Sequence, residues 1–390
     1  MSVRLLCNDI RLNFEKITWS GSHNQSSRKL TFTLPSNPYD KTFENVQIKL
    51  GDIVYFYYEK TRVFTGVITS RERTAEIGTV EYTAKDFMHY LLRSSGTYKF
   101  KNKTAEYIAQ TICKKYGITV GKVEKTKINI PKVFFENQCE YDIVVKCYRM
   151  AYAKTRIKYM LLMDGAKFCV IKKGTSSGVT LDQNKDITSA TYSDTTDNMV
   201  NIVKIYNDSM NLVGTVKNQN NVNKYGHYES VLKKEKGTNS KKEAQAMLVG
   251  VTKEASVEAI GNIKAISGYS IKISDAAVGL TGKFFIASDT HIFENGIHTM
   301  SLELAWNIEA EEGAEVVSVE KNVKKKLSNA SKAYYLDTGS VFHSISTCSA
   351  LSGKTPKRST VEKILKIKIS KGTNKGKSKY KACDKCWRKK

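Results

Sequence analysis

Alternating apolar and polar residues predict β structure in the first 95 positions. In the run KLTFTLP, the apolar Leu30, Phe32 and Leu34 alternate with Thr31 and Thr33, which is the two-residue period of a half-buried strand. Three more runs are rich in Val, Ile, Tyr, Phe and Thr: GDIVYFYYEK, RVFTGVITSRER and TVEYTAKD. Short strands at this spacing favour a compact antiparallel barrel or sandwich in residues 1–95.

The period changes to that of helices in residues 96–190. Thr104 can cap a helix through AEYIAQTICKKY, and Gly117 stands where a left-handed residue ends a helix. A second helix is predicted in YDIVVKCYRMAYAKT, whose apolar residues recur with a 3.6-residue period. KYMLLMD and AKFCVIKK then predict a hairpin around Asp164-Gly165. We expect a small α+β domain here.

Residues 191–312 return to the pattern of strands. The strand-like runs are MVNIVKIYN, MNLVGTVKN, YSIKISD, GKFFIASDTHIF and HTMSLELAWN. One helix is predicted after Asn239, because apolar residues from Ala244 to Val251 share a face. Residues 313–333 have the composition of a linker, and residues 334–390 form a separate unit too small to bury much core. The predicted class is a β-rich α+β multidomain protein.

Charge changes this picture only at the C-terminus. The formal net charge is +25, and residues 321–390 hold 20 Lys and Arg against 3 Asp and Glu, a net of +17. The first 320 residues therefore carry +8, so any signal for nucleic acid is confined to the tail. The N-terminus lacks the apolar core of a signal peptide, and no run of 18 apolar residues predicts a membrane span. We expect synthesis in the bacterial cytoplasm without a signal peptide.

The eight cysteines fall into two groups. Five are scattered and are expected to be buried free thiols: Cys7, Cys113, Cys139, Cys147 and Cys169. The other three lie in the last 43 residues and form, with His343, the pattern His343-x4-Cys348, then 34 residues, then Cys383-x2-Cys386. Zinc prefers four nitrogen or sulfur ligands, and a C-x2-C turn supplies two thiolates.

These four residues are the predicted metal ligands. The metal is expected to be structural zinc, with iron as the other candidate, because four protein ligands leave no position open for a catalytic water. Two plainer readings stay open: four unrelated residues, or a disulfide between cysteines. The lysines between Lys363 and Lys381 could touch phosphate or form a solvated face, and the second reading is favoured because few aromatic residues are interleaved with them.

The body offers no catalytic motif. It contains no GxSxG, Walker loop, HExxH or strand-linked GxGxxG. The histidines of the body are isolated in sequence and are expected to be ordinary core or surface residues. His291 and His298 flank a turn in THIFENGIHTM and could approach one another, but the pattern shows no nearby carboxylate or cysteine, so no site is predicted there.

An ordered set of motifs in residues 1–312 resembles a known family. GDIV, YTAKD, LLRSSGTYKFKNKTA, YDIVVKC, DNMVNIVKIYN, YGHYESV and SDTHIFENGIHTMSLEL occur in the same order in the baseplate hub proteins of contractile phage tails and tail-like bacteriocins, in the PBSX-type subgroup. The resemblance implies two antiparallel β-barrel domains with a small domain between them, a homotrimer, and no catalytic residues. It implies a hub in the baseplate of a virion or tail-like particle, which joins the six-fold tail tube protein ring to the three-fold central spike protein.

The basic C-terminal module could touch the tape-measure protein, the spike or anionic envelope polymers of the target cell, and the baseplate wedge is a further candidate partner. The predicted domains are thus 1–95 and 191–312 as barrels, 96–190 as the small α+β domain, 313–333 as linker and 334–390 as a Cys3His module. This module resembles small Cys/His modules of bacterial and phage proteins, although Phe342 and Ala382 replace their usual Tyr and Pro. Two alternatives stay open: a zinc protein that binds nucleic acid through its tail, and a hub with cell-wall hydrolase activity.

Overall fold

The computed structural model describes most of the body and short stretches of the tail. The described residues are 2–23, 25–37, 39–43, 45–73, 78–235 and 237–307, followed by 325–326, 332–336, 341–343, 357–360, 363–364, 381–382 and 387–388. The chain divides into two compact units, Met1–Val316 and Val317–Lys390. The first unit holds the predicted β and α+β regions.

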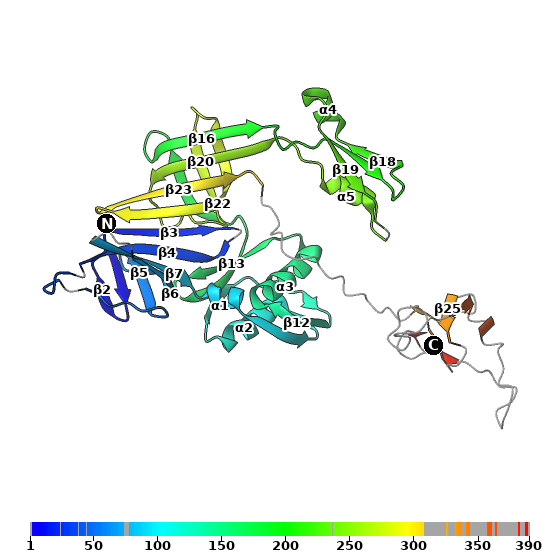
Figure 1. Cartoon of the computed structure of the whole chain (residues 1–390), viewed down its shortest axis with the longest axis horizontal. Helices are drawn as coiled ribbons and strands as arrows, with labels where there is room; N and C mark the ends of the chain where they lie inside the picture. The colour runs from blue at the N-terminus through cyan, green and yellow to red at the C-terminus, as the bar shows by residue number, and fades with distance from the viewer. Residues whose placement is uncertain are drawn as a thin grey trace, which may run out of the picture. The chain divides into compact units, whose positions relative to one another are not determined.

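The first unit is built on one large sheet of 13 strands (Figure 1). Eleven strands follow the order β16-β20-β23-β22-β3-β4-β7-β6-β5-β1-β2, and β21 and β15 branch from β22. The strands of the N-terminal region are β1 Val3–Cys7, β2 Ile10–Leu12, β3 Lys16–Ser22, β4 Gln25–Ser36, β5 Ile53–Tyr58, β6 Thr61–Arg73 and β7 Gly78–Asp86. Those of the later region are β15 Ser176–Asp182, β16 Ile187–Thr195, β20 Thr252–Ile260, β21 Ser270–Asp275, β22 Leu280–Glu294 and β23 Ile297–Ala305.

The predicted alternation is present in the N-terminal strands. Leu30, Phe32 and Leu34 of β4 point into an apolar core, and Thr31 and Thr33 lie on the other face. Strand β3 alternates in the same way, with Ile17 and Trp19 buried. This core also receives Phe293 from β22, more than 200 positions away in the sequence.

Strands β3 and β22 join the two β regions. They pair antiparallel from Ser22 opposite Ser288 to Lys16 opposite Glu294. The β-rich class is therefore confirmed. The two closed barrels stay a prediction, because in the described residues the strands of both regions share one sheet.

The α+β region lies between the two sets of strands. Its helices are α1 Met88–Arg93, α2 Ala105–Lys115 and α3 Glu140–Thr155, and its strands are β8 Ser95–Phe100, β9 Lys103–Thr104, β10 Thr119–Val123, β11 Asn129–Ile130, β12 Val133–Cys139, β13 Tyr159–Asp164 and β14 Lys167–Lys172. The Thr104 hydroxyl accepts a hydrogen bond from the Tyr107 N–H at 3.4 Å and Gly117 has φ +65°, so the predicted cap and stop of α2 are confirmed. Strands β13 and β14 form the predicted hairpin, with Asp164 opposite Lys167.

A small subdomain is inserted between β16 and β20. Thr195 at the end of β16 pairs with Thr252 at the start of β20, so the insertion leaves and re-enters the sheet at neighbouring positions. It contains β17 Ile202–Tyr206, β18 Leu212–Lys217, β19 Glu229–Lys233, α4 Gln219–Tyr225 and α5 Ser240–Ala246. Val203, Ile205, Val216 and Ala244 form its own core.

The expectation of one inserted helix was wrong. The helix after Asn239 exists as α5, but α4 precedes it. The Asn218 side chain accepts from the Asn221 N–H at 3.2 Å and caps α4. Helix α4 buries no residue, so its sequence has no apolar stripe by which it could be recognised.

The second unit is described only in short strands. These are β24 Lys325–Lys326, β25 Lys332–Tyr335, β26 Val341–His343, β27 Lys357–Thr360, β28 Lys381–Ala382 and β29 Trp387–Arg388. Four of them form a sheet in the order β27-β25-β26-β28. Most of the predicted linker, residues 313–333, lies outside the described residues. Among the described helices of the whole chain, none is long and apolar enough to cross a membrane.

Candidate functional site

Of the four predicted metal ligands, the structure describes one. His343 ends β26, lies opposite Tyr334 and is 2% exposed. Cys348, Cys383 and Cys386 lie outside the described residues, so the Cys3His site stays a prediction. Within the part of the chain that the structure describes, no group of three or more His, Cys, Asp or Glu residues is arranged to hold a metal ion.

Two features of the described residues fit the predicted site. Burial lowers the pKa of His343, so its imidazole is neutral at pH 7, the form that binds zinc. Strands β26 and β28 pair in parallel with Phe342 opposite Ala382. Their chain neighbours His343 and Cys383 are two of the four predicted ligands.

The scattered cysteines are free thiols, as predicted. Cys7, Cys113, Cys147 and Cys169 are buried, whereas Cys139 is half-buried. Burial raises the pKa of Cys7 to about 11 and those of Cys113 and Cys147 to about 12. These thiols are therefore protonated at neutral pH and are poor nucleophiles.

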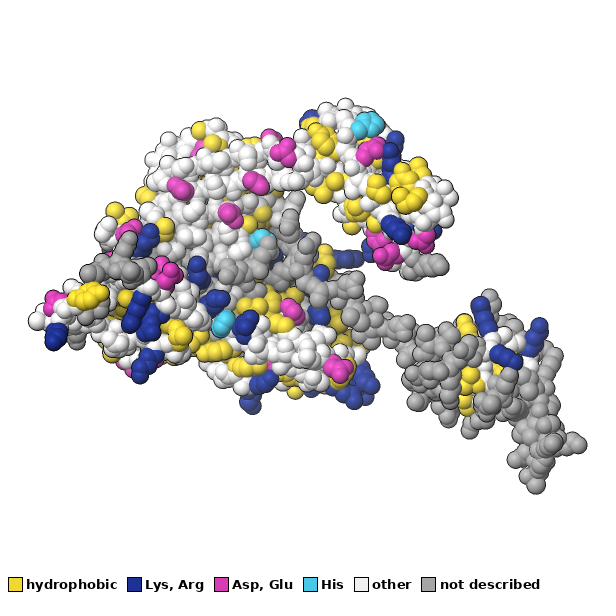
Figure 2. Space-filling view, in the orientation of Figure 1, with side chains coloured by type: hydrophobic (Ala, Val, Ile, Leu, Met, Phe, Trp, Pro, Cys, Tyr) yellow, Lys and Arg dark blue, Asp and Glu magenta, His cyan; other side chains and the backbone are white. Residues whose placement is uncertain are grey.

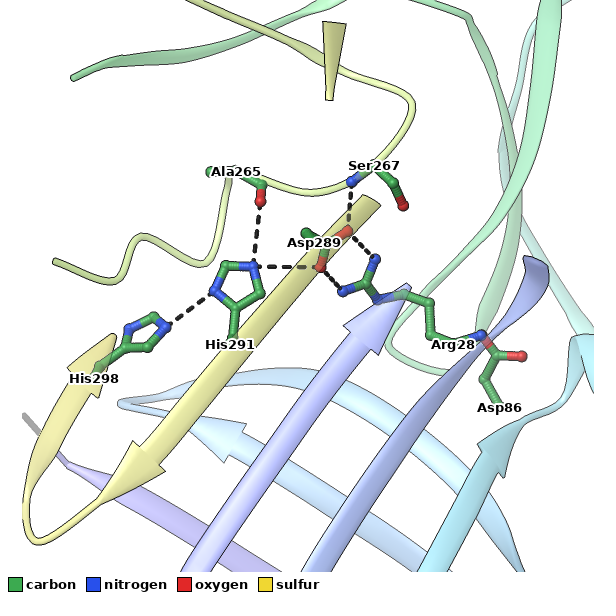
Figure 3. Close-up of polar contacts among 7 residues, drawn as sticks. All are labelled: Arg28, Asp86, Ala265, Ser267, Asp289, His291 and His298. Atoms are coloured by element: carbon green, nitrogen blue, oxygen red, sulfur yellow. Dashed lines mark hydrogen bonds and ion pairs between the residues drawn. The ribbon is translucent and has the colours of Figure 1, made fainter. Parts of the chain in front are cut away.

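The body contains a buried polar network, drawn in Figure 3. Arg28 of β4 and Asp289 of β22 form a bidentate ion pair, in which Nη1 donates to Oδ1 at 3.0 Å and Nη2 donates to Oδ2. Their side chains are 8% and 0% exposed. The Ser267 N–H also donates to Asp289 Oδ1, at 2.6 Å. The carboxylate thus joins β22, β4 and the loop before β21.

The network continues through two histidines. His291 Nε2 lies 3.2 Å from the Ala265 carbonyl and 3.4 Å from Asp289 Oδ2, and both of these atoms are acceptors. His291 Nε2 must therefore carry a proton. Its Nδ1 lies 3.0 Å from His298 Nε2. With both rings neutral, His298 Nε2 donates to His291 Nδ1, and the unpartnered His298 Nδ1 is left as an acceptor.

The pKa values of two carboxyl groups in and beside the network are shifted in opposite directions. Burial alone raises the pKa of Asp289, but the charge of Arg28 and hydrogen bonds from His291 and Arg28 outweigh it, so this pKa lies below its usual value. Burial raises the pKa of Asp86 to about 6, although the Arg28 N–H and the Ser27 hydroxyl donate to it. Arg28 therefore binds two carboxyl groups. Its side chain pairs with Asp289, and its backbone N–H donates to Asp86.

The interpretation of His291 and His298 from the sequence was right about their approach and wrong about the carboxylate. Asp289 stands two positions before His291, so both side chains point to the same face of β22. The two-residue spacing of Asp289 and His291 was visible in the sequence. It was not interpreted as a site, because polar side chains in a strand were not expected to point into the core. The network packs among aromatic rings. The centre of the His298 ring lies 4.1 Å from that of Phe293 and 5.7 Å from that of Tyr58. Its role in the body is to hold strands and a loop together.

The stability of this network is expected to depend on pH through His298. Burial and the neighbouring His291 lower the pKa of His298 from 6.5 to about 3. Between these values the unfolded chain binds a proton that the folded chain does not, so stability falls as the pH falls. The wild-type free energy of unfolding should fall by about 1.4 kcal/mol per pH unit relative to His298→Gln, which cannot titrate.

Urea unfolding of both proteins between pH 7 and pH 4 measures this difference. The comparison removes the opposing contribution of Asp86, whose raised pKa favours the folded state as the pH falls from 6 towards 3.8. His227→Gln, at a side chain that is 69% exposed, is the control and should be as stable as the wild type at pH 7. Parallel curves for wild type and His298→Gln would show that His298 titrates normally.

Comparison with solved structures defines the class of fold. The chain is similar to the 43 kDa tail protein of prophage MuSo2 from Shewanella oneidensis, with a TM-score of 0.59 at 16% identity, over 78% of this chain and 98% of that one. It is also similar to the tail protein from Neisseria meningitidis MC58, with a TM-score of 0.55 at 13% identity, over 78% and 95% of the two chains. The first unit therefore has a fold found in phage tail proteins.

The family is shown by a sequence model. The YQBQ-like family model matches residues 17–305, and the chain belongs to this family. It is 26% identical over 306 residues to the uncharacterized protein YqbQ of Bacillus subtilis (strain 168), and 24% identical over 306 residues to the phage-like element PBSX protein XkdQ of the same organism. Each match covers 76% of this chain and 93% of the relative. The resemblance to PBSX-type tail proteins is confirmed, and residues after 305 lie outside the family match.

Proposed function

We propose that this chain is the structural hub of a contractile phage tail or tail-like bacteriocin. In this role it joins the six-fold ring of the tail tube to the three-fold central spike. Family membership, the PBSX relative and the tail-protein fold support the proposal. The observation that carries it furthest is the pairing of β3 with β22, which places two β regions of one chain side by side in one sheet.

The pairing of β3 with β22 fits the symmetry that a hub requires. A trimer of chains with two β regions each presents six β regions around its axis, which matches a six-fold partner on one side and a three-fold partner on the other. The tube protein ring and the spike protein are the main partners in this proposal, with the tape-measure protein and the wedge as neighbours. The protein works in the particle's baseplate and is not an enzyme. Its large buried network stabilises the fold.

The hub proposal predicts both an oligomeric state and a place in the particle. The purified chain, of 43.9 kDa per copy, should sediment as a trimer. Quantitative mass spectrometry of purified tails should find three copies per particle, and deletion of the gene should yield tubes without a spike. A chain that stays monomeric at high concentration and is absent from purified tails would contradict the proposal.

We further propose that His343, Cys348, Cys383 and Cys386 hold a structural zinc ion in the second unit. The neutral, buried His343 and the pairing of its strand with β28 support this set. Zinc would supply the stabilisation that a unit of this size lacks, because so short a chain can bury little apolar core. Four protein ligands would close the coordination sphere and leave the metal without catalytic chemistry.

A further inference from the structure

The two ends of the large sheet carry unlike charges on their outward faces. At one end, β1, β2, β5 and β6 present the arginine face, which we define as Arg4, Arg11, Arg62, Tyr55 and Tyr57. At the other end, β20 and β23, beside the edge strand β16, present the glutamate face, defined as Glu254, Glu258 and Glu303. Figure 2 shows acidic and no basic side chains over β16 and β20.

Strand register places the arginine face away from the core. Tyr57 pairs with Arg4 on one side and with Arg62 on the other, which gives a continuous row. The next row outward joins Arg11, Leu6 and Tyr55. The intervening residues Leu5, Val54 and Phe56 are completely buried in the core, so the two rows point outward.

The guanidinium groups of this face have no carboxylate partner within 4.0 Å among the described residues. Arg4 lies 4.9 Å from the centre of the Tyr57 ring, and Arg62 lies 5.7 Å from that of Tyr55. These contacts orient Arg4 and Arg62 and supply no negative charge. Asp9 and Glu59 stand in the adjacent turns. Tyr and Arg are the residue types most enriched in protein interfaces.

The glutamate face is hydroxyl-rich and slightly hollowed. Glu254 pairs with Ser193, Glu258 lies between Ser189 and Ser301, and Glu303 lies between Ser256 and Ser288. Alternate residues Ala255, Val257 and Ala259 are buried, so the three carboxylates point outward. A pocket of about 440 Å³ lies beside this face, where Glu254, Glu303 and neighbouring hydroxyl residues meet Lys253 and the apolar Ala255, Ala287 and Leu304.

We propose that the arginine face of one copy binds the glutamate face of the next copy. The inference rests on the proposed hub function and names the surfaces through which the copies assemble. Three guanidinium groups without an ion-pair partner among the described residues can meet three carboxylates, and the Glu303 carboxylate also accepts a hydrogen bond from the Ser288 hydroxyl at 2.5 Å. Because the two faces differ, the contact is head-to-tail, and such contacts close into rings when the rotation between copies allows. Opposite charge fixes the register and excludes contact between like ends.

Charge reversal in the full chain tests the pairing. The variant Arg4→Glu/Arg62→Glu makes both faces acidic, and Glu254→Arg/Glu303→Arg makes both faces basic. Each is expected to weaken self-association by about 100-fold in sedimentation velocity at low salt. A chain with all four substitutions regains complementary faces and should form the wild-type oligomer again. Lys272→Glu, on an exposed position of β21, is the control and should assemble normally.

Mixing the two reversed variants gives a sharper result. Each acidic chain can then contact only basic chains, so the copies must alternate around a ring. An alternating ring needs an even number of chains, and the mixture should therefore yield even-numbered complexes and no trimer. Circular dichroism checks that every variant is folded, and the four-substitution chain serves as an internal check because recovery requires a folded protein.

The outcomes separate this inference from the hub proposal. Reversed variants that remain trimeric would overturn the pairing of the two faces and leave the hub proposal standing. A wild-type chain that is monomeric at every concentration would overturn both. Loss of assembly in the reversed variants without recovery in the four-substitution chain would also overturn the pairing, because complementary charge would then be insufficient.

Discussion

Replacing Asp289 with asparagine is expected to lower the free energy of unfolding of the first unit by about 3–5 kcal/mol. The substitution keeps the shape of the side chain but leaves the Arg28 cation, 8% exposed, without its anion. Removing one partner of a buried ion pair costs more than the pair contributes, because the remaining charge stays desolvated. Urea unfolding followed by tryptophan fluorescence measures the loss, since the Arg28 guanidinium lies 4.1 Å from the centre of the Trp19 ring.

The chain offers a matched control on neighbouring strands. Lys16 of β3 and Glu294 of β22 form an ion pair at 3.9 Å with side chains that are 44% and 47% exposed. Glu294→Gln should cost less than about 1 kcal/mol, because water screens this pair. The double variant Arg28→Met/Asp289→Asn should be more stable than Asp289→Asn alone, since it removes the unpaired charge. Equal losses for Asp289→Asn and Glu294→Gln would contradict a stabilising role of the buried pair.

Removal of metal is expected to unfold the second unit and leave the first intact. Zinc binding in small modules supplies on the order of 10 kcal/mol, more than the net stability of such a unit. In Cys383→Ser/Cys386→Ser, or after chelation, trypsin should digest the Lys- and Arg-rich tail quickly and stop at a fragment close to residues 1–316. The first unit should survive because its apolar cores are formed within residues 1–316.

Elemental analysis identifies the metal in the same samples. Wild type should contain one zinc ion per chain, and the double variant none. Cys139→Ser is the control, because this half-buried thiol lies outside the proposed set and its loss should leave the metal content unchanged. Iron in place of zinc would correct the identity of the metal, whereas folded wild type without either metal would refute the structural site.

Local patterns predicted the elements that carry a periodic apolar face. The alternation around Phe32 located β4, and the cap at Thr104 located the start of α2, because both signals lie within a few residues of the element they define. Helix α4 was missed since none of its residues is fully buried. Asn218, which caps the helix, was a start signal in the sequence, but no periodic apolar face follows it.

Contacts between strands that are far apart in the sequence could not be predicted from local patterns. Arg28 and Asp289 are 261 positions apart, and nothing in either segment indicates that β4 and β22 become neighbours of β3. Single arginines and aspartates in strands usually lie on the solvent face, so their burial here depends on the partner being present. The same holds for His291, whose inward direction follows only once the register of β22 is known.

The small subdomain between β16 and β20 can change without changing the large sheet. Its two connections leave the sheet at Thr195 and Thr252, which are cross-strand partners, and its apolar residues serve its own core. A tight turn at this point would close the same hairpin, so the length and content of the insertion can change without altering any strand register of the large sheet. Residues 196–251 are therefore a self-contained insertion, and a change in its surface need not disturb the cores of the large sheet.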